Sequence, residues 1–318
     1  MTIDSSISAR PGLVLGNTNI IIFDFFASLG IVSILVVLIP ALFSPRIRRS
    51  ATWFVVLVSW LVYSVSYILL FGRQTSSKPP PLGLCLFQAV LVYATPPLCA
   101  AATTCFTIDF FLKLLIVKLR GQKIGRKSRK LLISLPWALG LIISGEAILV
   151  VDDAKAVVPD PNLFYCHIER SVPTTTNVAI MILCGLIIIP LEVYTGILLY
   201  RNWTVFKRSN GGHARIALST LIRLALFSLV VSIAIVLSLF TATNMGNFAP
   251  PWSVVLMTMP TFSALCFGTQ RDILGVWQFW KRPPRQGTSS KFSDTGTQCP
   301  VDLEGNIVRP SAEAFIVT

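Results

Sequence analysis

The chain has 318 residues, of which 53% are apolar and only 13% are charged. A soluble domain usually carries roughly a quarter charged residues, so much of this surface must face a lipid bilayer. A net charge of +13 can indicate nucleic-acid binding, but here the basic residues lie in loops between apolar runs, and we expect no nucleic-acid partner.

Seven apolar runs are long enough to be membrane helices, because about 20 residues at a rise of 1.5 Å each span a hydrocarbon core of roughly 30 Å. In chain order we expect these helices at residues 18–43, 52–71, 84–117, 131–151, 176–200, 216–240 and 251–267. The predicted fold class is an all-α membrane protein, a seven-transmembrane helix bundle over residues 18–268.

A short amphipathic segment follows the seventh run, at residues 269–282. Ile273, Trp277 and Trp280 share one helical face there, with charged residues at both ends, as in a helix that lies in the headgroup layer. The alternative is that the seventh helix simply continues. Residues 283–318 are rich in Pro, Ser, Thr and Gly, and we expect them to form a disordered cytoplasmic tail.

The distribution of lysine and arginine predicts the orientation, because these residues favour the cytoplasmic side of a membrane. The N-terminus and the loops after the second, fourth and sixth helices hold only Arg10, Arg73, Lys78, Lys155 and Arg170. The loop after the third helix alone holds Lys118, Arg120, Lys123, Arg126, Lys127, Arg129 and Lys130. The loop after the fifth adds Arg201, Lys207, Arg208 and Arg215. We therefore expect a multi-pass protein with residues 1–17 outside and the C-terminus in the cytoplasm. The membrane that we expect is the plasma membrane.

Seven cysteines are present without any Cys-x-x-Cys pair, so we expect no zinc site. Five of them are expected to be inert, four packed inside helices and one in the tail. Cys85 and Cys166 differ from these. Cys85 lies at the outer end of the third helix and Cys166 in the outer loop after the fourth, where both face an oxidising compartment.

In these features the chain resembles the seven-helix receptors that couple to G proteins. The resemblance rests on the helix count, the outward N-terminus, Cys85 and Cys166 in the two bridging positions, and Pro136 before Trp137 in the fourth helix. Asp109 lies twenty-four residues after Cys85, where rhodopsin-like receptors place the acid of an acid–Arg–aromatic triplet.

Other features depart from the rhodopsin-like pattern. Asp109 is followed by Phe110 instead of Arg, the sixth helix has no Trp-x-Pro, and Pro260 of the seventh helix follows Met259 instead of Asn. With the stretch Tyr-Ala-Thr-Pro-Pro at residues 93–97, the chain looks like the divergent receptor-like proteins of mushroom-forming fungi.

The resemblance implies a G-protein-coupled-receptor-like membrane protein that senses an extracellular small-molecule or peptide ligand. It implies signalling to a heterotrimeric G protein, with no enzymatic activity and no cofactor. It also implies a disulfide between Cys85 and Cys166, since Cys166 is the only cysteine in any other outer segment. Candidate contacts to the G protein or to lipid are Arg120, Lys123, Arg126, Lys127, Lys207 and Arg208. The alternative for this basic run is that it only fixes topology and touches anionic lipid.

Ionisable residues inside membrane helices are costly and therefore candidates for function. The candidates are Asp109, Lys113 and Glu192, together with Asp24 and Glu146 near the outer helix ends and Arg223 near an inner end. Because Asp109 and Lys113 are four residues apart on one helix, they can pair. Prolines inside helices free backbone carbonyls and allow a pivot. The candidate switch positions of this kind are Pro96, Pro97, Pro190 and Pro260.

The alternative function is a seven-helix transporter or channel. Transporters of this size tend to show repeated halves and paired charges at the midplane, and the sequence shows no such repeat. A retinal protein needs a lysine in the seventh helix, and residues 251–267 contain none. An enzyme with a histidine-based site is not expected, because the two histidines, His167 and His213, both lie in predicted loops.

Overall fold

The structure is a computed structural model. It describes residues 11–44, 49–74, 80–119, 125–151, 157–159, 164–169, 171–201, 222–223, 225–227, 229–230, 252–269 and 273. Its helices are α1 (Pro11–Phe43), α2 (Ala51–Ile68), α3 (Leu82–Leu119), α4 (Arg126–Val150), α5 (Ser171–Arg201) and α8 (Trp252–Gly268). The strands β1 (Val157–Pro159) and β2 (Cys166–Ile168) form a short antiparallel hairpin, in which Val158 pairs with His167.

Five of these helices are long and apolar enough to cross a membrane. The five candidate spans are Thr18–Phe43, Ala51–Ile68, Leu82–Ile116, Arg126–Val150 and Ser171–Leu198. The apolar part of α8, Val254–Gly268, is shorter. The described positions of the predicted sixth helix, between residues 222 and 230, are helical. The protein is therefore a mostly helical, multi-pass membrane protein.

Three helices begin at least five residues earlier than hydropathy predicts, and one of them is α5, which starts at Ser171 instead of residue 176. α1 starts at Pro11 instead of residue 18, so residues 11–17 of the predicted tail are helical, and α4 starts at Arg126 instead of residue 131. Hydropathy detects the hydrocarbon core and not the helix itself. Lysine and arginine are good helix formers, so the basic residues before 131 continue the helix out of the apolar region.

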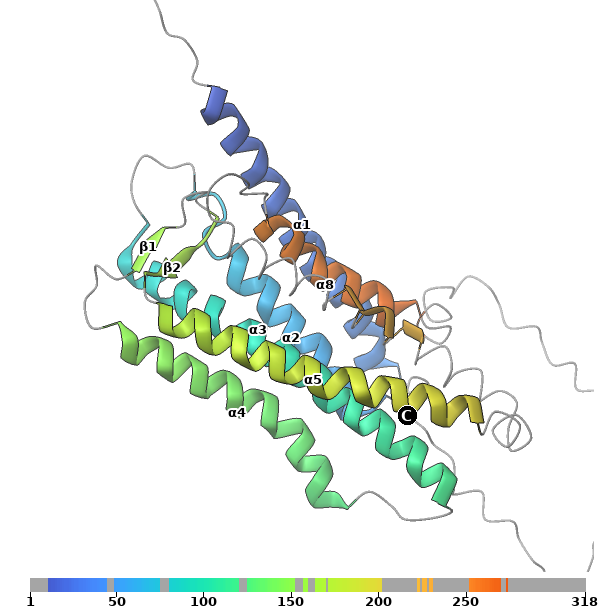
Figure 1. Ribbon diagram of the computed structural model, residues 1–318. Helices are drawn as coiled ribbons and strands as arrows, with labels where there is room; N and C mark the ends of the chain where they lie inside the picture. Colours follow the sequence, from blue (N-terminus) through green and yellow to red (C-terminus); the bar gives the residue numbers. More distant parts are fainter. Residues whose placement is uncertain are drawn as a thin grey trace, which may run out of the picture.

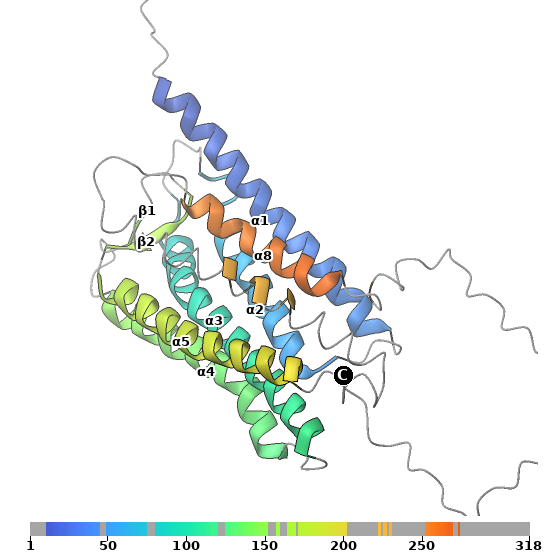
Figure 2. The ribbon, with the colours of Figure 1, turned by 45° about the vertical axis from the view of Figure 1, so that its right-hand side comes forward.

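The helices are arranged around α3. In Figures 1 and 2, α1 and α8 lie side by side on one flank and α4 and α5 on the other, with α2 and α3 between them. The hairpin covers one end of the bundle, called here the hairpin end. The opposite end, where α2 and α4 begin, is called the basic end. Among the five candidate spans α3 is the most buried, and α4 and α5 are the least buried.

The central place of α3 follows from a run of small residues at 99–105, Cys-Ala-Ala-Ala-Thr-Thr-Cys. Small side chains allow neighbouring helices to approach closely inside a membrane. The hydroxyls of Thr103 and Thr104 donate to the carbonyl oxygens of Cys99 and Ala100, one turn earlier, at 2.9 Å. Because these hydroxyls are satisfied within the helix, the neighbours of α3 can pack against it without supplying polar partners.

Two glycines bring α1 and α8 into close contact. A Cβ on Gly30 of α1 would lie 2.9 Å from the Cβ of Pro260 in α8 and 3.0 Å from the Oγ of Ser64 in α2. A Cβ on Gly268, the last residue of α8, would collide with the Val37 side chain of α1. Larger residues at either position would push the two helices apart.

Candidate functional site

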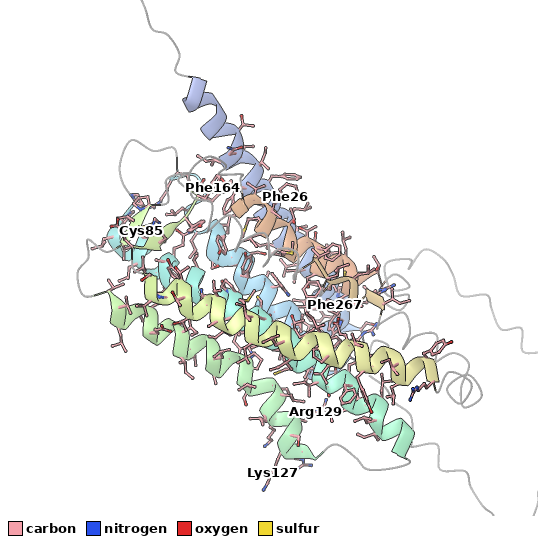
Figure 3. The ribbon with its side chains drawn as sticks, viewed as in Figure 1. Phe26, Cys85, Lys127, Arg129, Phe164 and Phe267 are labelled. Carbon is pink, nitrogen blue, oxygen red and sulfur yellow. A yellow bond between two sulfur atoms is a disulfide. The ribbon has the colours of Figure 1, made fainter. Side chains whose placement is uncertain are left out.

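A disulfide ties the hairpin to α3. The Cα atoms of Cys85, in the first turn of α3, and Cys166, the first residue of β2, lie 5.3 Å apart, and the two sulfurs are bonded. Both residues are buried. The predicted pairing of Cys85 with Cys166 is confirmed, and Figure 3 marks Cys85 at the hairpin end.

Gln88 and Tyr93 of α3 hold the same strand by hydrogen bonds. The backbone N–H of Cys166 donates to Oε1 of Gln88 at 3.1 Å, and the hydroxyl of Tyr93 donates to the carbonyl oxygen of Ile168 at 3.2 Å. The Nε2 of Gln88 donates to two carbonyl oxygens near the end of α2, those of Ser66 and Tyr67, at 3.2 Å each. One buried glutamine therefore fixes α2, α3 and the hairpin to one another.

A second glutamine ties the segment before β2 to α1. The Nε2 of Gln74, just after α2, donates to Oδ1 of Asp24 at 3.1 Å and to the carbonyl oxygen of Phe164 at 3.3 Å. The ring of Phe164 stacks on Phe23 with centroids 4.7 Å apart. Asp24 is 8% exposed, so this carboxylate faces the interior of the bundle. Neither glutamine carries a sequence signal, because a glutamine near a helix end usually lies in water.

Aromatic rings in contact run from the hairpin end toward the basic end; we call them the aromatic column. Its successive ring pairs have centroids 4.7 to 6.1 Å apart, within the range in which aromatic pairs attract. In order, the rings are Phe164, Phe23, Tyr67, Tyr63, Trp60, Phe227, Phe267 and Phe106. They come from the hairpin segment, α1, α2, the predicted sixth helix, α8 and α3. Trp60, Tyr63 and Tyr67 share one face of α2 at spacings of three and four. The sequence does not reveal how the other rings join them, because those rings come from different segments.

At the basic end, Asp109 joins α3 to the start of α2. Its Oδ2 accepts a hydrogen bond of 2.6 Å from the Thr52 hydroxyl and lies 3.0 Å from Nζ of Lys113. The Thr52 Oγ1 is also 3.0 Å from Oγ of Ser50, the N-cap residue of α2. The predicted pairing of Asp109 with Lys113 is confirmed. The buried carboxylate thus has both a cation and a neutral donor.

A second polar contact at this end joins the predicted sixth helix to α8. Nη1 of Arg223 donates to the carbonyl oxygen of Cys266 at 3.2 Å, and Nη2 donates to that of Thr269 at 3.0 Å. The last carbonyls of a helix lack partners within the helix, and a cation near them is favourable. Arg223 therefore caps the end of α8 from a neighbouring segment.

Of the remaining charged candidates, the structure describes three, which lie on two different helices. Glu192 is half-buried in α5. Arg126 and Lys127 are exposed at the start of α4. Four basic candidates lie outside the described residues: Arg120, Lys123, Lys207 and Arg208. The same holds for residues 1–10, for the tail at 283–318, and for the amphipathic segment 269–282 except Thr269 and Ile273.

The candidate prolines do not interrupt their helices. α3 continues across Pro96 and Pro97, α5 across Pro190, and α8 across Pro260. The helices are therefore not broken at these prolines, and the role of the prolines as pivot positions stays a prediction. Neighbouring helices support the chain at one of these sites, since Pro260 packs against Gly30 of α1.

The free cysteines of the described segments, Cys99, Cys105, Cys184 and Cys266, are all buried, as expected of inert thiols. Among the described residues no group of three or more His, Cys, Asp or Glu side chains could hold a metal ion.

Comparison with known proteins adds no family, because no protein-family model and no curated protein matches the chain.

Proposed function

We propose that the chain is a seven-helix receptor of the plasma membrane, with the hairpin end outside the cell and the basic end in the cytoplasm. It would sense an extracellular small-molecule or peptide ligand at the hairpin end. It would signal through a heterotrimeric G protein at the basic end, where α4 begins with four basic residues, Arg126, Lys127, Arg129 and Lys130.

The observation that carries this proposal is the contrast between the two ends of one packed bundle. At the hairpin end, a disulfide and two glutamines fasten a loop over α1, α2 and α3. At the basic end, single polar side chains join one helix to the next, through Asp109 and through Arg223. An allosteric receptor needs two states with different contacts, and contacts made by single side chains at the effector end can exchange between such states.

The position of the buried charges supports a receptor over a transporter. Transporters bind ions and substrates near the midplane. Asp109 instead contacts the first turn of α2 through Thr52, which places it near a helix end, and Lys113 neutralises it. The hydrogen bond between Thr52 and Asp109 is thus suited to holding α2 against α3.

An energy-transfer assay between the tagged chain and each Gα subunit of its host tests the proposal. We expect at least one Gα subunit to associate specifically, with an unrelated multi-pass protein at equal expression as the control. Failure of every Gα subunit would overturn G-protein coupling. Reconstituted vesicles that move a solute at rates dependent on Glu192 would instead establish the transporter.

A further inference from the structure

The first turn of α4 concentrates positive charge that the described part of the chain leaves unbalanced. Residues 126–130 are all exposed, and four of the five are cationic: Arg126, Lys127, Arg129 and Lys130. The first turn of α4 contains no acidic residue. Among the described residues none of the four cations takes part in a salt bridge. An external anion would relieve the repulsion between these like charges.

The two lysines lie on the exposed apolar stripe of α4. Lys127 is followed at intervals of four by Leu131 and Leu135, which are 61% and 48% exposed. Lys130 lies on the same exposed side, four residues before the exposed Ser134 and eleven residues before Leu141, which is 74% exposed. Since residues four apart share a helix face, both lysines project on the side of α4 that faces away from the bundle. Figure 3 shows Lys127 directed away from the other helices.

Arg129 lies on the opposite face of the same helix turn. The residues three, seven and eleven positions later, Leu132, Pro136 and Gly140, are all buried. A Cβ on Gly140 would lie 3.5 Å from the Leu98 side chain of α3, so this face packs against the bundle. Within the first turn of α4, Lys127 and Lys130 therefore project away from the bundle, and Arg129 lies on the face toward it.

The stripe also places the lysines at the depth of lipid headgroups. Its apolar part begins at Leu131, directly after Lys130, and Lys127 lies one turn further out, about 6 Å along the helix axis. A lysine at such a boundary keeps its stem along the apolar surface and extends its ammonium group to the headgroups.

We propose that Lys127 and Lys130 form a binding site for the headgroups of anionic phospholipids in the leaflet at the basic end. This inference rests on the proposed placement of that end at the cytoplasmic leaflet, and it does not require G-protein coupling. Each lysine near an anionic membrane surface is expected to contribute about fivefold to lipid preference, and the pair about thirtyfold.

The test uses the full chain in phosphatidylcholine bilayers that contain spin-labelled phosphatidylserine, with the protein-bound fraction of the label as the readout. We expect Lys127→Gln and Lys130→Gln each to lower the preference for phosphatidylserine about fivefold, and high salt to weaken it. Arg129→Gln is the matched control, because it removes the same charge from the opposite face. It should leave the preference near the wild-type value.

Two further measurements separate the proposal from its competitors. The double variant K127R/K130R should restore the preference, and the melting temperature of each variant in phosphatidylcholine alone confirms that it folds. An equal loss in R129Q would mean that only bulk charge matters and would overturn the site. Glutamine variants that keep the lipid preference but lose Gα association would assign the lysines to a protein contact. If no Gα subunit associates but the lysine variants still lose the lipid preference, only the proposed function is contradicted and the lipid site stands.

Discussion

The carboxylate of Asp109 is 4% exposed and receives contacts from two helices, a hydroxyl donor on α2 and an ammonium group one turn along α3. A buried charge is tolerated in a membrane helix only when such partners are present. Lys113 keeps 26% of its side chain exposed, so solvent screens the pair and its strength is moderate.

At this scale we predict that Asp109 and Lys113 are energetically coupled. Asp109→Asn should lower the free energy of unfolding by about 1 to 3 kcal/mol, because Lys113 and Thr52 lose an ionised acceptor. Lys113→Met alone should lower the free energy of unfolding at least as much, because it leaves the buried carboxylate of Asp109 with only the neutral Thr52 donor. Thermal unfolding of both single variants and of the double variant measures the coupling. Strictly additive effects would show that the ion pair contributes nothing.

Residue patterns predicted some contacts and missed others for a physical reason. The pairing of Asp109 with Lys113 depends on spacing within one helix, which the sequence displays directly. The contacts of Gln88 and the order of the aromatic column depend on how each helix is rotated about its axis. Rotation is set by packing with partners that are distant in the chain, and a single sequence does not specify it.

Among the helices, the close approach of α8 to α1 depends on the absence of side chains. Gly30 faces Pro260, and Gly268 faces Val37. Hydropathy locates such helices well, because the apolar length needed to cross a bilayer is fixed. It fails at their ends, as at Arg126 of α4 and Pro11 of α1, because a helix can extend into water without any apolar signal.

We predict that Gly268→Ala destabilises the bundle by about 1 to 3 kcal/mol, the usual cost of adding atoms to a packed interior. The added methyl group would overlap the side chain of Val37. Shortening that neighbour, as in V37A/G268A, should recover part of the loss. Gly185→Ala in α5 is the matched control, because nothing lies within 4 Å of its added Cβ, and it should be neutral or slightly stabilising. Equal losses for both alanines would exclude the close contact as the cause.

In the whole molecule, the hairpin end is cross-linked by a disulfide, whereas the basic end is held by the contacts of single polar side chains. The disulfide, Gln88 and Gln74 fix the hairpin over three helices, and the aromatic column continues from Phe164 to Phe267 and Phe106 near the end of α8. Coupling between distant sites requires an element with two arrangements that both sites bias. The capping contact of Arg223 is suited to that role, because two hydrogen bonds hold the predicted sixth helix to α8.

For the proposed receptor function, we predict that Arg223 stabilises the arrangement that does not bind a G protein. Arg223→Leu removes both hydrogen bonds to the end of α8. Because the contact is partly exposed, we expect its loss to shift the equilibrium between the two arrangements by about 1 kcal/mol. That shift corresponds to roughly a fivefold rise in ligand-independent Gα association. Arg223→Lys keeps the charge with a single point of contact and should fall between wild type and leucine.

A distance measurement distinguishes the release of the Arg223 contact from a loss of folding. Spin labels on cysteines introduced at Ile222 and Thr269, two exposed positions beside the contact, report the separation of the two segments without any G protein. In R223L the distance distribution should broaden toward longer values, while the melting temperature stays close to that of the wild type. A rise in Gα association with an unchanged distribution would place the inactive-state restraint elsewhere. A broadened distribution with unchanged association would show that the contact is structural and does not gate signalling.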